Sequence, residues 1–183
     1  MIKKLSLVFL LTCLSLTAAA NSLIYIGEGV RQNTIGSSFD TYKMVHHAAN
    51  THRALTPDVA RTLDLTMIAS WGFFFTKEKM IEALKDSLLA NMTSEEFAAY
   101  SGEVEKFKKT LLQLPINPGT QLQFVHVPGE GLRILMNGKL VLRSADSNFS
   151  MKVFSIWLGK ASANANNRGS LEQLIENLWK NAN

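Results

Sequence analysis

The apolar and polar residues of the chain alternate in ways that predict strands first, then helices, then strands and helices again. Alternation with a period of two places successive side chains on opposite faces of a sheet. On this pattern the predicted strands cover residues 23–31, 39–45, 60–68, 122–127, 132–136 and 140–143. Asn137-Gly138 predicts a tight hairpin turn between the last two strands.

Apolar residues that recur at helical spacing predict two helices in the middle of the chain. Thr76 is the expected N-cap of a helix over residues 77–92. Thr93 and Glu96 have the spacing of a capping box, which opens the second helix, and Pro115 ends it.

Two further helices are predicted near the C-terminal end. One covers residues 149–158 and is closed by Gly159, and Ser170 with Gln173 boxes the start of the other. Since strands and helices are segregated along the chain, we expect an α+β domain, an antiparallel sheet with helices covering one face. We assign this domain to residues 21–183.

Residues 1–20 have the anatomy of a secretory signal peptide. Two lysines precede a short apolar run, and alanines at 18–20 offer a cleavage site. We expect cleavage after Ala20 and export to the periplasm of a bacterium. The alternative is a lipoprotein acylated on Cys13, but Thr12 suits that signal poorly.

Cleavage changes the charge and the cysteine content. Cys13 is the only cysteine, so the mature chain has no disulfide. Nineteen Lys and Arg residues less Lys3 and Lys4 leave 17 against 15 acidic residues, a formal charge of +2. A formal charge this small does not indicate a protein that binds nucleic acid. No second apolar segment has the length to cross a membrane.

The common signatures of cofactor and metal sites are missing from the sequence. It has no glycine-rich phosphate loop and no GxSxG, HExxH or CxxC motif. His46 and His47 are neighbours on a predicted strand and therefore point to opposite faces. We accordingly expect neither a metal nor a cofactor.

The stretch YIGEGVRQ, residues 25–32, places a cation in an apolar strand. A period of two puts Tyr25, Gly27, Gly29 and Arg31 on the face of Leu23. The glycines leave that face bare, which is typical of a bulge or of a close approach by another group.

Arg31 needs a partner, because a charge inside a sheet is costly unless it is paired. One interpretation is a salt bridge to Glu28 or Asp64. The other is a guanidinium fork that binds the carboxylate or phenolate of a ligand. The residue pattern leaves both open.

Two longer segments resemble the chalcone isomerase fold family. IGEGVRQNTIGSSFDTYK resembles its opening strands, and LRILMNGKLVLRSADSNFSMKVFSIWLG resembles its closing hairpin, helix and IWLG-like turn. The resemblance covers nearly the whole mature chain and is closest to the secreted bacterial chalcone isomerase-like branch. It implies the family's antiparallel sheet with helices on one face.

The resemblance also implies roles for particular residues. The arginine of the family falls on Arg31. In isomerases that arginine holds a phenolate, and in fatty-acid-binding members it holds a carboxylate. The pocket Ser/Thr falls on Ser150. Lys43, next to Tyr42, stands where isomerases have a threonine.

A Tyr and an Asn of the isomerases, seven residues apart on a helix, fall near Phe97 and Val104. The chain therefore keeps the residue that holds an anion and loses most of the catalytic network.

We therefore expect a periplasmic, monomeric, non-enzymatic binder of a fatty acid or similar amphipathic acid in a mostly apolar cleft. Its expected ligand-binding residues are Arg31, Ser150, Tyr42 and Lys43, with no assigned catalytic residue unless Arg31 serves an enzyme. One alternative is an intramolecular lyase that acts on a chalcone-like phenol. The other is an envelope scaffold without a ligand.

Overall fold

The strands of the protein form one antiparallel sheet. The computed structural model describes residues 23–35, 37–70, 76–161 and 168–183, and the predicted signal peptide lies outside them. The six strands lie side by side in chain order, each antiparallel to its neighbours. They are β1 (Ile24–Ile35), β2 (Ser37–Ala48), β3 (Arg61–Met67), β4 (Gln121–Val127), β5 (Gly131–Met136) and β6 (Lys139–Ser144).

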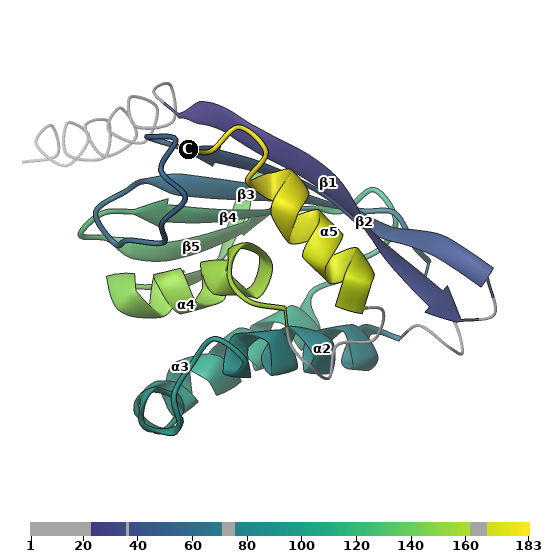
Figure 1. Ribbon diagram of the computed structural model, residues 1–183. Coiled ribbons are helices and arrows are strands. Elements are labelled where there is room, and N and C mark those ends of the chain that lie inside the picture. Colours follow the sequence, from purple (N-terminus) through teal and green to yellow (C-terminus); the bar gives the residue numbers. More distant parts are fainter. Residues whose placement is uncertain (1–22, 36, 71–75, 162–167) are drawn as a thin grey trace, which may run out of the picture.

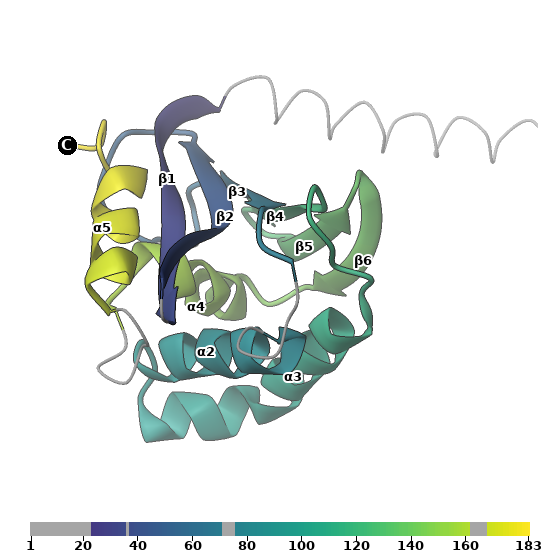
Figure 2. The same cartoon turned by 90° about the vertical axis from the view of Figure 1, so that its right-hand side faces the viewer.

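Helices cover one face of this sheet. They are α2 (Lys77–Leu89), α3 (Ser94–Gln113), α4 (Ser147–Leu158) and α5 (Arg168–Leu178). Figures 1 and 2 show α4 between the sheet and the α2–α3 pair, whereas α5 lies across β1. The predicted α+β arrangement is confirmed.

The local signals at helix starts and turns act as the sequence predicts. The side chain of Thr76 accepts from the backbone N–H of Lys79, and Thr93 and Glu96 form the reciprocal capping box. Asn137 and Gly138 both have positive φ, at 49° and 79°, which suits a tight hairpin turn.

At two predicted helix boundaries, Gly159 and Ser170, the structure gives the residue another role than the sequence suggested. Gly159 closes α4 with a φ of −100°, outside the left-handed region. The constraint comes instead from Asn91, because a Cβ on residue 159 would overlap the side-chain oxygen of Asn91. Ser170 lies inside α5 instead of capping it, and its hydroxyl accepts from the backbone N–H of Gln32 at 2.9 Å. The Ser170 hydroxyl on α5 thus satisfies a backbone N–H group of strand β1.

The helix-facing side of the sheet forms the core. Alternation places one buried row from each strand on that side, and the rows pair across the ladder. These rows include Met44, His46, Leu63, Leu65, Leu122, Phe124, His126, Leu132, Ile134 and Leu142. Such burial is the main source of stability for a domain that has no disulfide.

Strand β1 has a bulge and a close contact, both of which its glycines permit. A register shift between Tyr25 and Gly27 interrupts the predicted alternation, so Tyr25 lies against His47 while Ile26 is buried. The prediction that Tyr25 shares a face with Gly27 is therefore wrong. Gly27 and Gly29 lie directly beneath α5, as expected from their bare surface.

Candidate ligand-binding site

Arg31 and Tyr42 lie opposite each other on β1 and β2, on the helix-facing side of the sheet. Paired side chains on adjacent antiparallel strands lie on the same face. Tyr42 is 5% exposed and Arg31 is half-buried. Their position brings a cation and a phenol together beneath the helices.

Burial and mutual electrostatics set the protonation of this pair. Burial lowers the pKa of Arg31, although its guanidinium stays charged at neutral pH. Burial also raises the pKa of Tyr42, while the charge of Arg31 and a hydrogen bond from Trp157 oppose that rise. Tyr42 is therefore a neutral phenol beside a cation.

Trp157 on α4 completes this group of side chains. Its indole Nε1–H donates to the hydroxyl oxygen of Tyr42 at 3.1 Å. Its ring packs on Phe124, with centroids 4.8 Å apart, and is fully buried. The hydrogen bond between Trp157 and Tyr42 therefore links α4 to β2.

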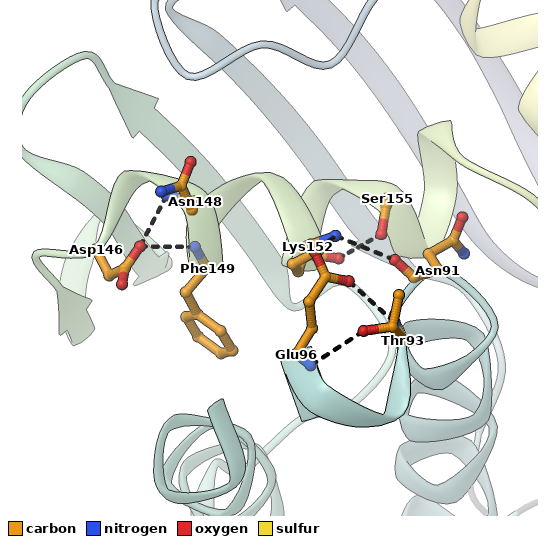
Figure 3. Close-up of polar contacts among 8 residues, drawn as sticks. All are labelled: Asn91, Thr93, Glu96, Asp146, Asn148, Phe149, Lys152 and Ser155. Carbon is orange, nitrogen blue, oxygen red and sulfur yellow. Dashed lines mark hydrogen bonds and ion pairs between the residues drawn. The ribbon is translucent and has the colours of Figure 1, made fainter. Parts of the chain in front are cut away.

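The start of α4 is held by its N-cap, and its middle is held by an ion pair (Figure 3). Asp146 accepts from the backbone N–H groups of Asn148 and Phe149 at 2.8 and 2.9 Å. Lys152 pairs with Glu96, the capping-box residue of α3, at 2.7 Å. The capping box thus also anchors the helix that carries Trp157.

Asn91 fixes the other end of α4. Its amide nitrogen donates to the carbonyls of Ser87 and Lys160, and its side-chain oxygen accepts from the backbone N–H of Lys160. Its own carbonyl accepts from Lys152 at 3.4 Å. With both ends of the helix held, Trp157 has a defined position over the sheet.

Ser150, the predicted pocket hydroxyl, is fully buried on α4. Its oxygen lies 3.0 Å from His126 Nδ1, and His126 Nε2 lies 2.9 Å from the carbonyl oxygen of Pro57. Because a carbonyl only accepts, Nε2 carries the hydrogen and Nδ1 accepts from Ser150. Burial lowers the pKa of His126, in agreement with a neutral ring. Ser150 is therefore hydrogen-bonded to β4, at a distance of two helical turns along α4 from Trp157.

Lys43 lies on the opposite face of the sheet. Its ammonium group pairs with Glu28 at 2.9 Å, and both side chains are substantially exposed. Asp64, the other carboxylate considered for Arg31, accepts from Gln123 at 2.7 Å and lies 3.6 Å from His47 on that same outer face. The structure thus brings together Arg31 and Tyr42 and keeps Lys43 apart from them.

The sequence analysis missed Trp157 and His126 as partners of predicted site residues. Trp157 lies seven residues after Ser150, a spacing that puts both side chains on one helix face, and this was the available signal. His126 had no such signal, because its partners come from a distant helix and from the 49–60 loop.

The profile of the chalcone isomerase-like family matches residues 13–171. The chain belongs to the chalcone isomerase-like family. The search of curated proteins found no match to this sequence.

Among solved structures, a fatty-acid binding protein from Arabidopsis thaliana is similar to this chain. The two align with a TM-score of 0.59 and 14% sequence identity, over 87% of this chain and 91% of that chain. At this identity the likeness shows the fold alone. Within the described residues, no helix combines the length and apolarity needed to cross a bilayer.

Two positions on α3, Phe97 and Val104, differ in residue type from the catalytic tyrosine and asparagine of the isomerases. Phe97 and Val104 have apolar side chains without a hydroxyl or an amide. Val104 is buried and Phe97 packs against the core. Tyr100, the nearest hydroxyl, has its ring 5.5 Å from that of Phe149.

A second buried polar group lies at the opposite end of the strands. Arg61 is fully buried, donates to the carbonyl of Ala54, and lies with its guanidinium carbon 5.3 Å from the Trp179 ring centroid. Its Nη1 lies 3.4 Å from His46 Nε2, and His46 Nδ1 lies 3.0 Å from the carbonyl oxygen of Leu178. Burial and the neighbouring cation lower the pKa of His46 to about 4. This group ties the sheet to the end of α5.

Proposed function

We propose that the protein is a periplasmic, non-enzymatic binder of a fatty acid or a similar amphipathic acid, whose head group Arg31 holds. The observation that supports this is the position of Arg31, across the ladder from buried Tyr42 and on the helix-facing side. A guanidinium presents paired donors that match a carboxylate, and Tyr42 adds a phenol beside it. The likeness of fold to a plant fatty-acid binding protein agrees with this function.

The proposed head-group contact supplies the preference for an acid. A hydrogen bond to a charged group contributes about 1.5–3 kcal/mol, which corresponds to roughly 10- to 150-fold in affinity. Most of the affinity would come from the chain of the ligand, at about 0.8 kcal/mol for each CH₂ removed from water. An ester of the same acid should bind more weakly than the free acid.

The surroundings of the other two predicted residues narrow the proposed site. Ser150 would have to give up its hydrogen bond to His126 in order to contact a head group. Lys43 would have to leave Glu28 and cross the sheet. We therefore assign the head group to Arg31 and Tyr42.

Native mass spectrometry of the mature protein, purified from the periplasm, tests the proposal. We expect an acid to copurify with the wild type and to be lost from Arg31→Ala. The matched control is Arg133→Ala, which removes another strand arginine, paired with Glu130 on the outer face. The acid should remain with this variant.

Two results would contradict the proposal. If the Arg31→Ala variant retained the acid as fully as the control, Arg31 would not hold the head group. If the wild type converted a chalcone and Arg31→Ala abolished that turnover, the isomerase alternative would replace the binder. The same spectra weigh the chain, and a mature protein that begins at Asn21 is expected if the signal peptide is cleaved after Ala20.

A further inference from the structure

We propose that Trp157 is a positioning residue that keeps Tyr42 a hydrogen-bond donor toward the head group, so that the site prefers acids to alcohols of the same length. This inference rests on the proposed function. It adds a residue on α4 to the site and assigns a direction to the hydrogen bond of the Tyr42 hydroxyl.

The direction follows from the chemistry of the indole ring. A tryptophan side chain has one N–H donor and no acceptor. In the 3.1 Å contact, Tyr42 Oη therefore accepts from Trp157 Nε1, and the hydroxyl keeps its own hydrogen for another acceptor. Because Trp157 is fully buried against Phe124, next to the anchored C-terminal end of α4, it offers this donor from a fixed place.

The second neighbour of Tyr42 reinforces the same preference. Arg31 lies opposite Tyr42 on β1, and a guanidinium also donates hydrogen bonds without accepting any. A head group between Arg31 and Tyr42 would face donors from both sides. A carboxylate has two oxygens with which to accept from both residues and a charge that strengthens each bond. An alcohol has one neutral oxygen, and its own hydrogen could go only to the Tyr42 oxygen, which already accepts from Trp157.

Binding of dodecanoic acid and of 1-dodecanol, measured by calorimetry on the mature protein, tests this assignment. We expect the wild type to prefer the acid by at least about tenfold. Trp157→Phe and Tyr42→Phe should each reduce that preference by about three- to tenfold. If Trp157 acts through Tyr42, the double variant should lose no more than Tyr42→Phe alone.

Trp179 supplies a matched control. It is another buried tryptophan whose Nε1–H donates within the protein, here to the carbonyl of Leu158 at 3.0 Å. Trp179→Phe therefore removes the same kind of donor from the C-terminal end of α4, one residue beyond Trp157, and leaves the hydrogen bond from Trp157 to Tyr42 in place. This variant should unfold more easily than the wild type and keep the full preference for the acid.

The outcomes separate the two proposals. If Tyr42→Phe loses the preference and Trp157→Phe keeps it, or if their effects add in the double variant, the role of Trp157 is refuted and the binder stands. If the wild type does not prefer the acid, both proposals fail.

A measurement on the wild type covers the case in which Trp157→Phe does not fold. The indole N–H signals of ¹⁵N-labelled protein can be assigned by elimination with Trp71→Phe and Trp179→Phe, since the chain has three tryptophans. Dodecanoic acid should shift the Trp157 signal, and this shift should be absent from Tyr42→Phe. A signal that stays in place while the acid binds would overturn the assignment.

Discussion

Replacing Gly27 by alanine should loosen the contact between α5 and β1. A Cβ at this position would overlap the carbonyl oxygen of Asn177 and lie 3.0 Å from the carbonyl carbon of Leu178. These are backbone atoms, so no rotation of a side chain can relieve the overlap. The end of α5 has to move away from the sheet.

The cost can be worked out from what α5 buries. Its buried side chains are Leu171, Leu174, Ile175 and Leu178. Full burial of an aliphatic side chain contributes about 1.5–3 kcal/mol, or about 6–12 kcal/mol for these side chains together. A gap of roughly 0.5–1 Å forfeits a quarter to a half of the contact energy. Gly27→Ala should therefore lower the free energy of unfolding by about 1.5–6 kcal/mol.

Equilibrium unfolding in urea, followed by far-ultraviolet circular dichroism, measures this loss. The control is Gly102→Ala on the exposed side of α3, where a Cβ would meet nothing within 4 Å in the described part of the chain. That change should stabilise the protein by about 0.5–1 kcal/mol, because alanine suits a helix interior better than glycine. A Gly27→Ala variant that unfolds within about 0.5 kcal/mol of the wild type would refute the packing argument.

Two further results should follow from the described contacts. Because the pKa of His46 is about 4 in the folded protein, against an ordinary value of 6.5, the unfolded chain binds this proton first. Stability should fall as the pH falls from 6.5 to 4, by up to about 1.4 kcal/mol per pH unit. His46→Gln should reduce this slope in urea titrations at several pH values, leaving the part that His126 contributes, and an unchanged slope would contradict the assignment. Thr93→Ala should lower the free energy of unfolding by about 1 kcal/mol, because it removes half of the capping box, and a Tm equal to that of the wild type would argue against this.

Local chemistry explains why the sequence predicted the order and type of the elements. Thr76 and Thr93 satisfy backbone donors within four residues, and the positive φ of Asn137 and Gly138 belongs to the turn itself. The predicted ends were least accurate in β1 and β2, which are longer than expected. Pairing between the two strands extends them beyond the residues that show clear alternation.

The site was less predictable because its contacts join distant parts of the chain. Tyr42 and Trp157 are 115 residues apart in the sequence, and His46 and Leu178 are 132 residues apart. The sequence singled out Arg31 and left open whether it pairs with Glu28, with Asp64 or with a ligand. Both carboxylates have partners on the outer face, where Arg31 does not point.

The sequence by itself determined the strands, helices, caps and hairpin turn, and it marked Gly27, Gly29 and Arg31 as unusual. The tertiary structure decided why they are unusual. It placed the backbone of α5 over the glycines, Tyr42 beside Arg31, and Trp157 against Tyr42. Periodicity and capping depend on near neighbours in sequence, whereas burial and hydrogen-bond direction at this site depend on segments that meet only when the sheet and helices pack.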